Sequence, residues 1–206
     1  MVDFIFNGQY IMVKSYDLEP YFTKLVYKAC SGEKNYQRAK HQNRPNLGPI
    51  TEHTYSFYIK TAGQPAKVVA SNTIYSCEPV RHTEGFIEHM PSQTPQYLNS
   101  LGLKNPKART NCQLRLDEFG KRRVPLKPFG ELSNGRSGFY IHDSKLGETN
   151  GCIEVEEDFF NHVQAYENAT SKESLTIEVK YPSEETITNY DEAASRGITK
   201  HLYPKK

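Results

Sequence analysis

The chain has 206 residues, with 26 lysines and arginines against 24 aspartates and glutamates. This length suits one domain with a hydrophobic core, alone or with an insertion, and the near balance of charge disfavours a nucleic-acid-binding protein. No apolar run is long enough for a transmembrane helix. Residues 1–8 lack the basic and apolar stretches of a cleaved secretion signal. We therefore expect a chain that is made in the cytoplasm without a cleaved signal peptide and that has no membrane span.

The first third of the chain has the patterns of short β-strands. Phe4–Phe6 is followed by Asn7-Gly8, a turn signal that is typical of a hairpin. Alternating apolar and polar residues over 55–59 indicate a half-buried strand. Residues 33–50 are polar and aperiodic, which predicts a long loop. The strand-like runs lie at residues 4–6, 10–13, 25–29, 55–59 and 68–70.

The segment of residues 78–130 has no clear period. Pro91 and Pro95 interrupt it, and the charged residues 115–123 predict a hairpin. We expect this segment to be a partly irregular insertion that lines a cleft or docks a partner.

Regular patterns return in the last third of the chain. Apolar residues recur at helical spacing between Val155 and Tyr166, so a helix is expected over residues 156–168. Residues 174–181 alternate as a strand. Residues 182–206 are polar, which is typical of a tail or a peripheral helix.

The most informative stretch is a strand-like run that ends in His142 and is followed, after a short loop, by Cys152. Phe139 and Ile141 are predicted to face the core, which puts Tyr140 and His142 on the opposite face. A thiol becomes a useful nucleophile when a base or a positive field supports its thiolate. Because a strand end and the loop after it can bring two side chains together, we interpret Cys152 as a nucleophile and His142 as its base.

These residues resemble the catalytic motif of L,D-transpeptidases (the YkuD-like family), in which a strand-end histidine and a loop precede a Ser/Thr-x-Gly-Cys sequence. Here the motif reads His142 and Thr149-Asn150-Gly151-Cys152. The short loop is similar to the branch of the family that includes type VI secretion effectors. A second match to that branch is Ser31-Gly32 followed by Gly48-Pro49-Ile50.

The resemblance covers residues 2–75 and 130–181. It implies a mainly β fold, an antiparallel YkuD-like β-sandwich with one helix after the cysteine. It also implies one catalytic domain over residues 1–181, with the insertion at about 78–130 and the tail at 182–206. The implied activity is that of an L,D-transpeptidase or L,D-carboxypeptidase, which cleaves or exchanges the terminal D-alanine of peptidoglycan tetrapeptide stems through a thioester. No metal or cofactor is implied.

The resemblance assigns roles to individual residues. Cys152 would attack the substrate carbonyl, and His142 would hold and return the proton. The backbone N–H groups of Gly151, Cys152 and Asn150 are candidate donors to the oxyanion, and Gly151 would leave room for the incoming carbonyl. The other candidates are Thr149 for positioning, Arg136, Ser137 and Tyr140 for substrate binding, and Asp143, Ser144 or a backbone carbonyl for orienting the histidine.

The same branch implies a set of partners. An effector of this kind acts on peptidoglycan stem peptides in the periplasm of target bacteria, after delivery by the type VI secretion apparatus. Its producer needs a cognate immunity protein, which we expect to cover the cleft.

Two departures from the family pattern keep other functions open. Glu154 stands where many members have arginine, which predicts a change in how a substrate carboxylate is held, and Asp143 replaces a glycine. The alternatives are a non-catalytic cell-wall-binding or interaction module on the same fold and a housekeeping cell-wall transpeptidase. A papain-like peptidase would need a histidine after Cys152, but His162 falls in the predicted helix and His201 in the tail.

The remaining cysteines, Cys30, Cys77 and Cys112, allow at most one disulfide, and their spacing does not choose it. Cys77, His82 and His89 match no zinc-binding spacing. We therefore expect no metal site.

Overall fold

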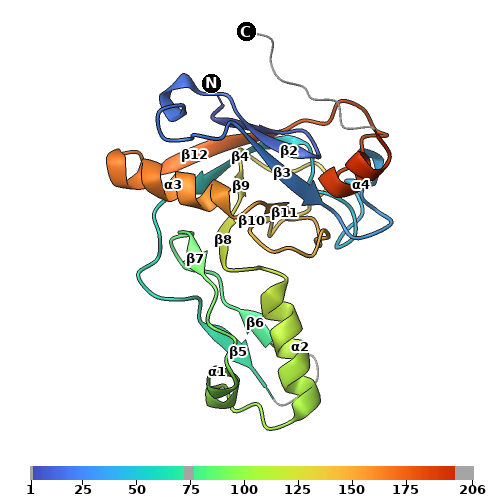
Figure 1. The fold of residues 1–206 in the computed structure, drawn as a ribbon. Helices are drawn as coiled ribbons and strands as arrows, with labels where there is room; N and C mark the ends of the chain where they lie inside the picture. Colours follow the sequence, from blue (N-terminus) through green and yellow to red (C-terminus); the bar gives the residue numbers. More distant parts are fainter. Residues whose placement is uncertain (1, 72–76, 198–206) are drawn as a thin grey trace.

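The computed structural model describes residues 2–71 and 77–197. In these residues the fold is mainly β, as the sequence predicts, with one large sheet, a two-stranded sheet and four short α-helices (Figure 1). The strands are β1 (Phe4–Phe6), β2 (Tyr10–Val13), β3 (Val26–Ser31), β4 (His53–Tyr58), β5 (Val68–Ala70), β6 (Cys77–Pro79), β7 (Glu88–His89), β8 (Arg122–Pro125), β9 (Lys127–Pro128), β10 (Tyr140–His142), β11 (Ile153–Val155) and β12 (Ser174–Val179). The helices are α1 (Pro95–Ser100), α2 (Pro106–Asp117), α3 (Asp158–Ala169) and α4 (Tyr190–Ser195), with 3₁₀ turns at Tyr16–Leu18 and Ala39–His41.

The large sheet has the strand order β7-β8-β10-β11-β3-β2-β1-β12-β4-β9 and curls on itself. β8 and β9 lie near its two ends although only Leu126 separates them in the chain, so the curl brings these ends together. Most strand pairs are antiparallel, but β1–β12 and β10–β11 are parallel. The sheet is therefore mixed, whereas the resemblance implies an antiparallel one. The parallel β10–β11 pair forms because residues 143–152 return the chain to the edge where β10 began.

The main core lies between the curled sheet and helix α3. The rings of Phe4, Phe57 and Phe159 are buried and contact one another, with ring centroids 5.3 to 6.3 Å apart. Burying one such side chain contributes about 1.5–3 kcal/mol. Helix α3 confirms the helical spacing in the sequence, and β12 confirms the predicted alternation by burying every second side chain.

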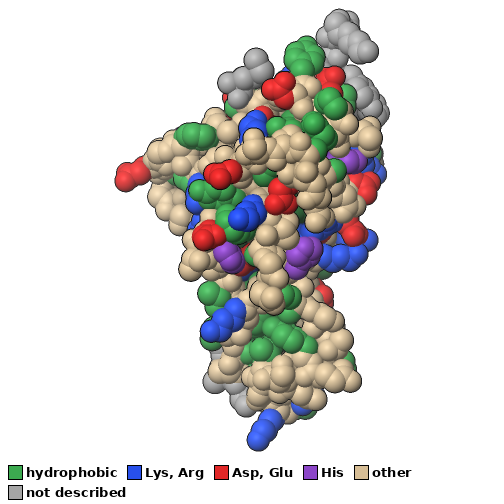
Figure 2. Space-filling model, turned by 90° about the vertical axis from the view of Figure 1, so that its left-hand side faces the viewer, with side chains coloured by type: hydrophobic (Ala, Val, Ile, Leu, Met, Phe, Trp, Pro, Cys, Tyr) green, Lys and Arg blue, Asp and Glu red, His purple; other side chains and the backbone are tan. Residues whose placement is uncertain are grey.

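β5, β6, α1 and α2 form a lobe that projects from the large sheet and is narrower than it (Figures 1 and 2). A disulfide between Cys77 and Cys112 joins β6 to α2, and Cys30 stays a free thiol. The lobe does not coincide with the insertion predicted over residues 78–130. Strands β8 and β9 lie within that segment but belong to the large sheet, whereas β5 belongs to the lobe but precedes the segment. The lobe has its own apolar cluster, which includes Val68, Leu98, Leu103, Ala108 and Leu116.

The hairpin predicted over residues 115–123 is wrong. Helix α2 continues to Asp117, and β8 begins at Arg122. The helix is started by Asn105, whose side chain accepts a backbone N–H of the first turn, and by Pro106 at the first helical position. Asn105 and Pro106 are the sequence signal for the start of this helix, and the charged residues that follow them do not show a helical period.

Residues 182–197 pack back onto the sheet. Thr188 Oγ1 donates to the carbonyl of Ser31 over 2.7 Å, and the Asn189 side chain caps α4. Residues 198–206 of the predicted tail lie outside the described residues. Within the part of the chain that the structure describes, no helix is long and apolar enough to cross a membrane.

Candidate active site

Strands β10 and β11 place the predicted nucleophile and base close together. Ile141 and Ile153 are register partners in this parallel pair, and both are fully buried. His142 ends β10 and Cys152 lies directly before β11, so the pairing of the two strands brings these residues to one part of the sheet. Cys152 is a half-buried residue with a free thiol, whereas His142 is buried.

Both side chains line one cavity of about 400 Å³ between the sheet and the lobe. In the described part of the chain, no direct hydrogen bond links the thiol to the imidazole. Such contacts are often long in unliganded enzymes and shorten when the substrate binds. The lobe side of the cavity is formed by Glu78, Pro79, Arg115, Glu118 and Phe119.

Ser144 orients the imidazole of His142. Ser144 Oγ lies 3.1 Å from His142 Nδ1 and donates its own proton to the Glu154 carboxylate. Because an ionised carboxylate only accepts hydrogen bonds, the Ser144 oxygen is left to accept the proton of Nδ1–H. His142 Nε2 then carries a lone pair, which is the state that a general base needs.

Burial determines the protonation of both groups. Burial and the nearby Arg123 guanidinium lower the pKa of His142 to about 3. Burial raises the pKa of the Cys152 thiol to about 11, although a hydrogen bond with the Tyr140 backbone and three guanidinium groups oppose this shift. At neutral pH the site therefore holds a thiol and a neutral imidazole. The three guanidinium groups belong to Arg115, Arg123 and Arg136.

Thr149 holds the turn that precedes Cys152. Its Oγ1 donates to the carbonyl of Cys152 over 2.7 Å. The same oxygen accepts the backbone N–H groups of Gly32 at 3.1 Å and Gly151 at 3.2 Å. Because the Gly151 N–H points to Thr149, the N–H groups of Asn150 and Cys152 are the candidates left for an oxyanion.

Gly151 is required for a reason other than the one predicted. Its φ is +102°, a region that L-residues rarely adopt. A Cβ at this position would overlap the Arg136 guanidinium and lie 3.2 Å from the Gly48 carbonyl oxygen. The glycine therefore makes room for an arginine of the fold rather than for a substrate carbonyl.

Arg136 is engaged within the fold. Its guanidinium donates to three carbonyl groups in the loop of residues 42–49 and does not line the cavity. The predicted contact between Arg136 and a substrate carboxylate is therefore not supported, and its remaining effect is positive charge near Cys152. Ser137 and Tyr140 do line the cavity.

Asp143 points away from the imidazole. Its carboxylate accepts the backbone N–H groups of Lys121 and Arg122 and forms a buried ion pair with Arg122 at 2.9 Å. The close approach depends on Gly120, because a Cβ there would overlap the backbone of residues 143–144. Asp143 thus holds the loop against β8, and Ser144 is the orienting candidate that contacts the histidine.

The sequence elements that carry the family resemblance meet around the cysteine turn. Ser31 Oγ accepts the N–H of Ile50 at 2.9 Å, and Gly32 donates its N–H to Thr149. A Cβ at Gly32 would lie 3.0 Å from the Pro49 nitrogen. Three segments that are far apart in the sequence therefore form one packed unit.

The sequence patterns did not reveal the role of Arg123. This residue is 1% exposed and pairs with Glu88, with Nε 2.7 Å from Oε2. Its guanidinium lies 4.5 Å from the ring centroid of Phe119 and 4.7 Å from that of Tyr140. The sequence signal around Arg123 is the charged run of residues 115–123, which predicts a hairpin instead.

The other histidines and cysteines considered from the sequence do not form a rival site. His162 lies in α3, where its ring nitrogens contact Tyr27 Oη at 2.6 Å and Thr23 Oγ1 at 2.9 Å, and it does not line the cavity. His201 lies outside the described residues. The sulfur of Cys77 is bonded in the disulfide, so it is not available as a thiolate ligand.

Compared with known proteins, the chain matches no protein-family model. A search of the curated proteins also gives no match.

Proposed function

We propose that the protein is a cysteine-dependent L,D-transpeptidase or L,D-carboxypeptidase that acts on peptidoglycan tetrapeptide stems. The observation that carries this proposal is the cavity shared by Cys152 and His142, with the Nε2 lone pair of His142 available. The packing of Ser31-Gly32 and Pro49-Ile50 around the cysteine turn supports it. On this proposal, the curled sheet is a mixed variant of the YkuD-like sandwich.

In the first step, His142 Nε2 accepts the thiol proton while Cys152 Sγ bonds to the stem carbonyl carbon. The N–H groups of Asn150 and Cys152 hold the tetrahedral oxyanion, and losing one such donor raises the barrier by about 3 kcal/mol. His142 then gives the proton to the D-alanine nitrogen as the C–N bond breaks. This leaves a thioester on Cys152 and releases D-alanine.

The thioester has two fates. Attack by water gives the shortened stem, and attack by a D-amino acid or a stem amine gives exchange or a crosslink. In each case His142 takes a proton from the attacking group and returns it to the departing sulfur. The free thiol and the neutral imidazole are then restored.

Mass spectrometry of tetrapeptide muropeptides tests the activity. The wild type should remove or exchange the terminal D-alanine, whereas Cys152→Ala and His142→Gln should each lose activity by roughly 100-fold or more. His162→Gln is the matched control for His142→Gln, because His162 lies in α3 and does not line this cavity. Unchanged muropeptides with the wild type, or equal turnover by Cys152→Ala, would reject the enzyme and favour a non-catalytic cell-wall-binding module.

The family branch also motivates a biological role as an antibacterial type VI effector with a cognate immunity protein. Expression directed to the periplasm should lyse or swell bacteria, whereas cytosolic expression should be mild. Equal toxicity in the two compartments would point to a different target. Periplasmic expression without harm would favour a housekeeping cell-wall transpeptidase.

A further inference from the structure

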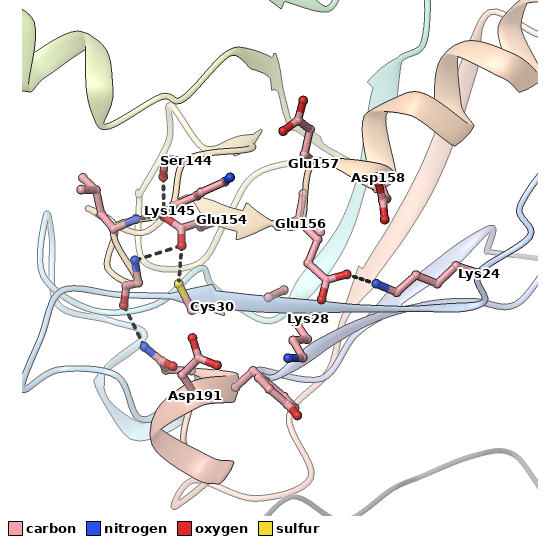
Figure 3. A pocket seen from close by; sticks show the side chains of 16 residues that line it. Lys24, Lys28, Cys30, Ser144, Lys145, Glu154, Glu156, Glu157, Asp158 and Asp191 are labelled. Carbon is pink, nitrogen blue, oxygen red and sulfur yellow. Dashed lines mark hydrogen bonds and ion pairs between the residues drawn. The ribbon is translucent and has the colours of Figure 1, made fainter. Parts of the chain in front are cut away.

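Glu154 lies on β11, where it is the register partner of His142. It does not line the cavity of Cys152 but faces a second cavity of about 560 Å³, where Figure 3 shows its carboxylate between Ser144 and Cys30. The family-based expectation that this position affects a substrate carboxylate is therefore not supported. Glu154 is 9% exposed, so its negative charge needs hydrogen-bond donors.

Donors from the catalytic loop converge on this carboxylate. Oε2 accepts from the Ser144 hydroxyl and from the Leu146 N–H at 3.0 Å. Oε1 accepts from the Gly147 N–H at 2.9 Å and faces the Cys30 thiol at 3.8 Å. Each oxygen thus holds one backbone N–H of the loop that joins the histidine to the cysteine.

We propose that Glu154 is a positioning residue that acts through Ser144 to hold His142 in its Nδ1–H tautomer and, through the loop N–H groups, fixes the turn that presents Cys152. The kinetic consequence rests on the proposed function. The tautomer and the loop geometry do not, because they are properties of the resting protein.

The Glu154 carboxylate determines the donor and the acceptor of each hydrogen bond between it and His142. Glu154 can only accept, so Ser144 donates to it and must accept from His142 Nδ1. When the imidazole takes the thiol proton, the same chain places an anion two hydrogen bonds behind the imidazolium. An acid that accepts directly from a catalytic histidine keeps the useful tautomer, and here Ser144 would relay that effect from Glu154 to His142.

The substitution Glu154→Gln tests the role of the carboxylate directly, because it keeps the shape of the side chain but replaces one accepting oxygen with a donating NH₂ group. Whichever way the amide is turned, its NH₂ group meets a backbone N–H, that of Leu146 in one orientation and that of Gly147 in the other. When the NH₂ group faces Ser144, the serine must accept from it and turn its own proton towards His142. The Nε2–H tautomer, which has no lone pair towards the cavity, then becomes populated.

Nitrogen-15 NMR of the imidazole measures the tautomer in the resting protein. The wild type should show His142 protonated at Nδ1, and both Glu154→Gln and Ser144→Ala should increase the Nε2–H form. The kcat for D-alanine release should fall by about 10- to 100-fold in both variants, with KM within a factor of about three. Glu156→Gln is the control, because Glu156 lines the same second cavity but pairs with Lys24.

An unchanged His142 spectrum in both variants would overturn the proposal, whether or not the protein cleaves muropeptides. A raised KM at an unchanged kcat would also overturn it. The expected spectra in a protein that leaves muropeptides intact would support the positioning role and reject the enzymatic function. Ser144→Ala keeps the loop N–H bonds to Glu154, so it tests the relay even if Glu154→Gln fails to fold.

Discussion

The Cys77–Cys112 disulfide permits a test of how the lobe supports the site. The two cysteines are 35 residues apart in the sequence, and replacing both with serine removes the cross-link but leaves two small side chains. For a closed loop of this length, chain entropy predicts a loss of about 4 kcal/mol in the stability of the linked region. Because the lobe has an apolar cluster separate from the main core, most of this loss should fall on the lobe.

The effect should reach the cavity through the neighbours of the disulfide. Glu78 follows Cys77, and Arg115 lies about one helical turn after Cys112. Their side chains pair at 3.1 Å and line the cavity. Since the large sheet holds the nucleophile and the base, loosening the lobe should weaken substrate binding more than chemistry. We expect KM to rise in the double serine variant while kcat stays within a factor of about two.

Hydrogen exchange of the amides in α2 and α3, with and without dithiothreitol, measures this prediction. In the wild type, the reductant should speed exchange in α2 but not in α3, and the double serine variant should exchange rapidly in α2 under both conditions. Cys30→Ser should respond to the reductant as the wild type does. Equal protection of α2 in the wild type and the double serine variant, at an unchanged KM, would refute the reasoning.

The titration and the backbone of the site give three further tests. Folding lowers the pKa of His142 from 6.5 to about 3, so the unfolded chain binds more protons than the folded chain between these pH values. The free energy of unfolding, measured with urea, should therefore decrease by up to about 1.4 kcal/mol per pH unit as the pH falls through this window. His142→Gln should remove that contribution. Alkylation of Cys152 by iodoacetamide should accelerate with pH up to about 11, and a plateau near neutral pH would contradict the raised pKa. Gly151→Ala should cost roughly 3 kcal/mol in unfolding free energy from strain and overlap, whereas Gly130→Ala, also at positive φ but in open space, should cost only about 1 kcal/mol.

Much of the fold was predictable because its signals are local. Strand β12 alternates with a period of two, and helix α3 follows a period of 3.6, so each is marked by its own residues. The turn signal Asn7-Gly8 marks the end of β1 in the same way. The parallel pairing of β10 with β11 was not predictable, since strand partners are chosen by long-range packing. Helix α2 was missed because its buried residues, Ala108, Cys112 and Leu116, form one narrow row among charged residues.

The sequence placed the candidate nucleophile and base because both belong to one short segment. The roles of other site residues were predicted less well, because their partners are distant in the sequence or are backbone groups that no sequence pattern marks. Arg136 binds backbone carbonyls in the loop of residues 42–49, which no side-chain pattern marks. The role of Glu154 depends on how the loop after His142 folds back onto β11, and a residue-by-residue comparison with a family does not show this.

The charges around the site favour the thiolate of Cys152, whereas burial favours the thiol. At rest, burial keeps the thiol and the imidazole neutral. Proton transfer would create a thiolate near three guanidinium groups and an imidazolium backed by Ser144 and Glu154. Arg123, which is paired with Glu88, supports the thiolate but opposes the imidazolium, so its charge does not favour the ion pair as a whole. Since burial keeps both groups neutral at rest, the proton should leave the thiol only as Sγ bonds to the substrate carbonyl carbon, when the negative charge passes to the oxyanion and its N–H donors.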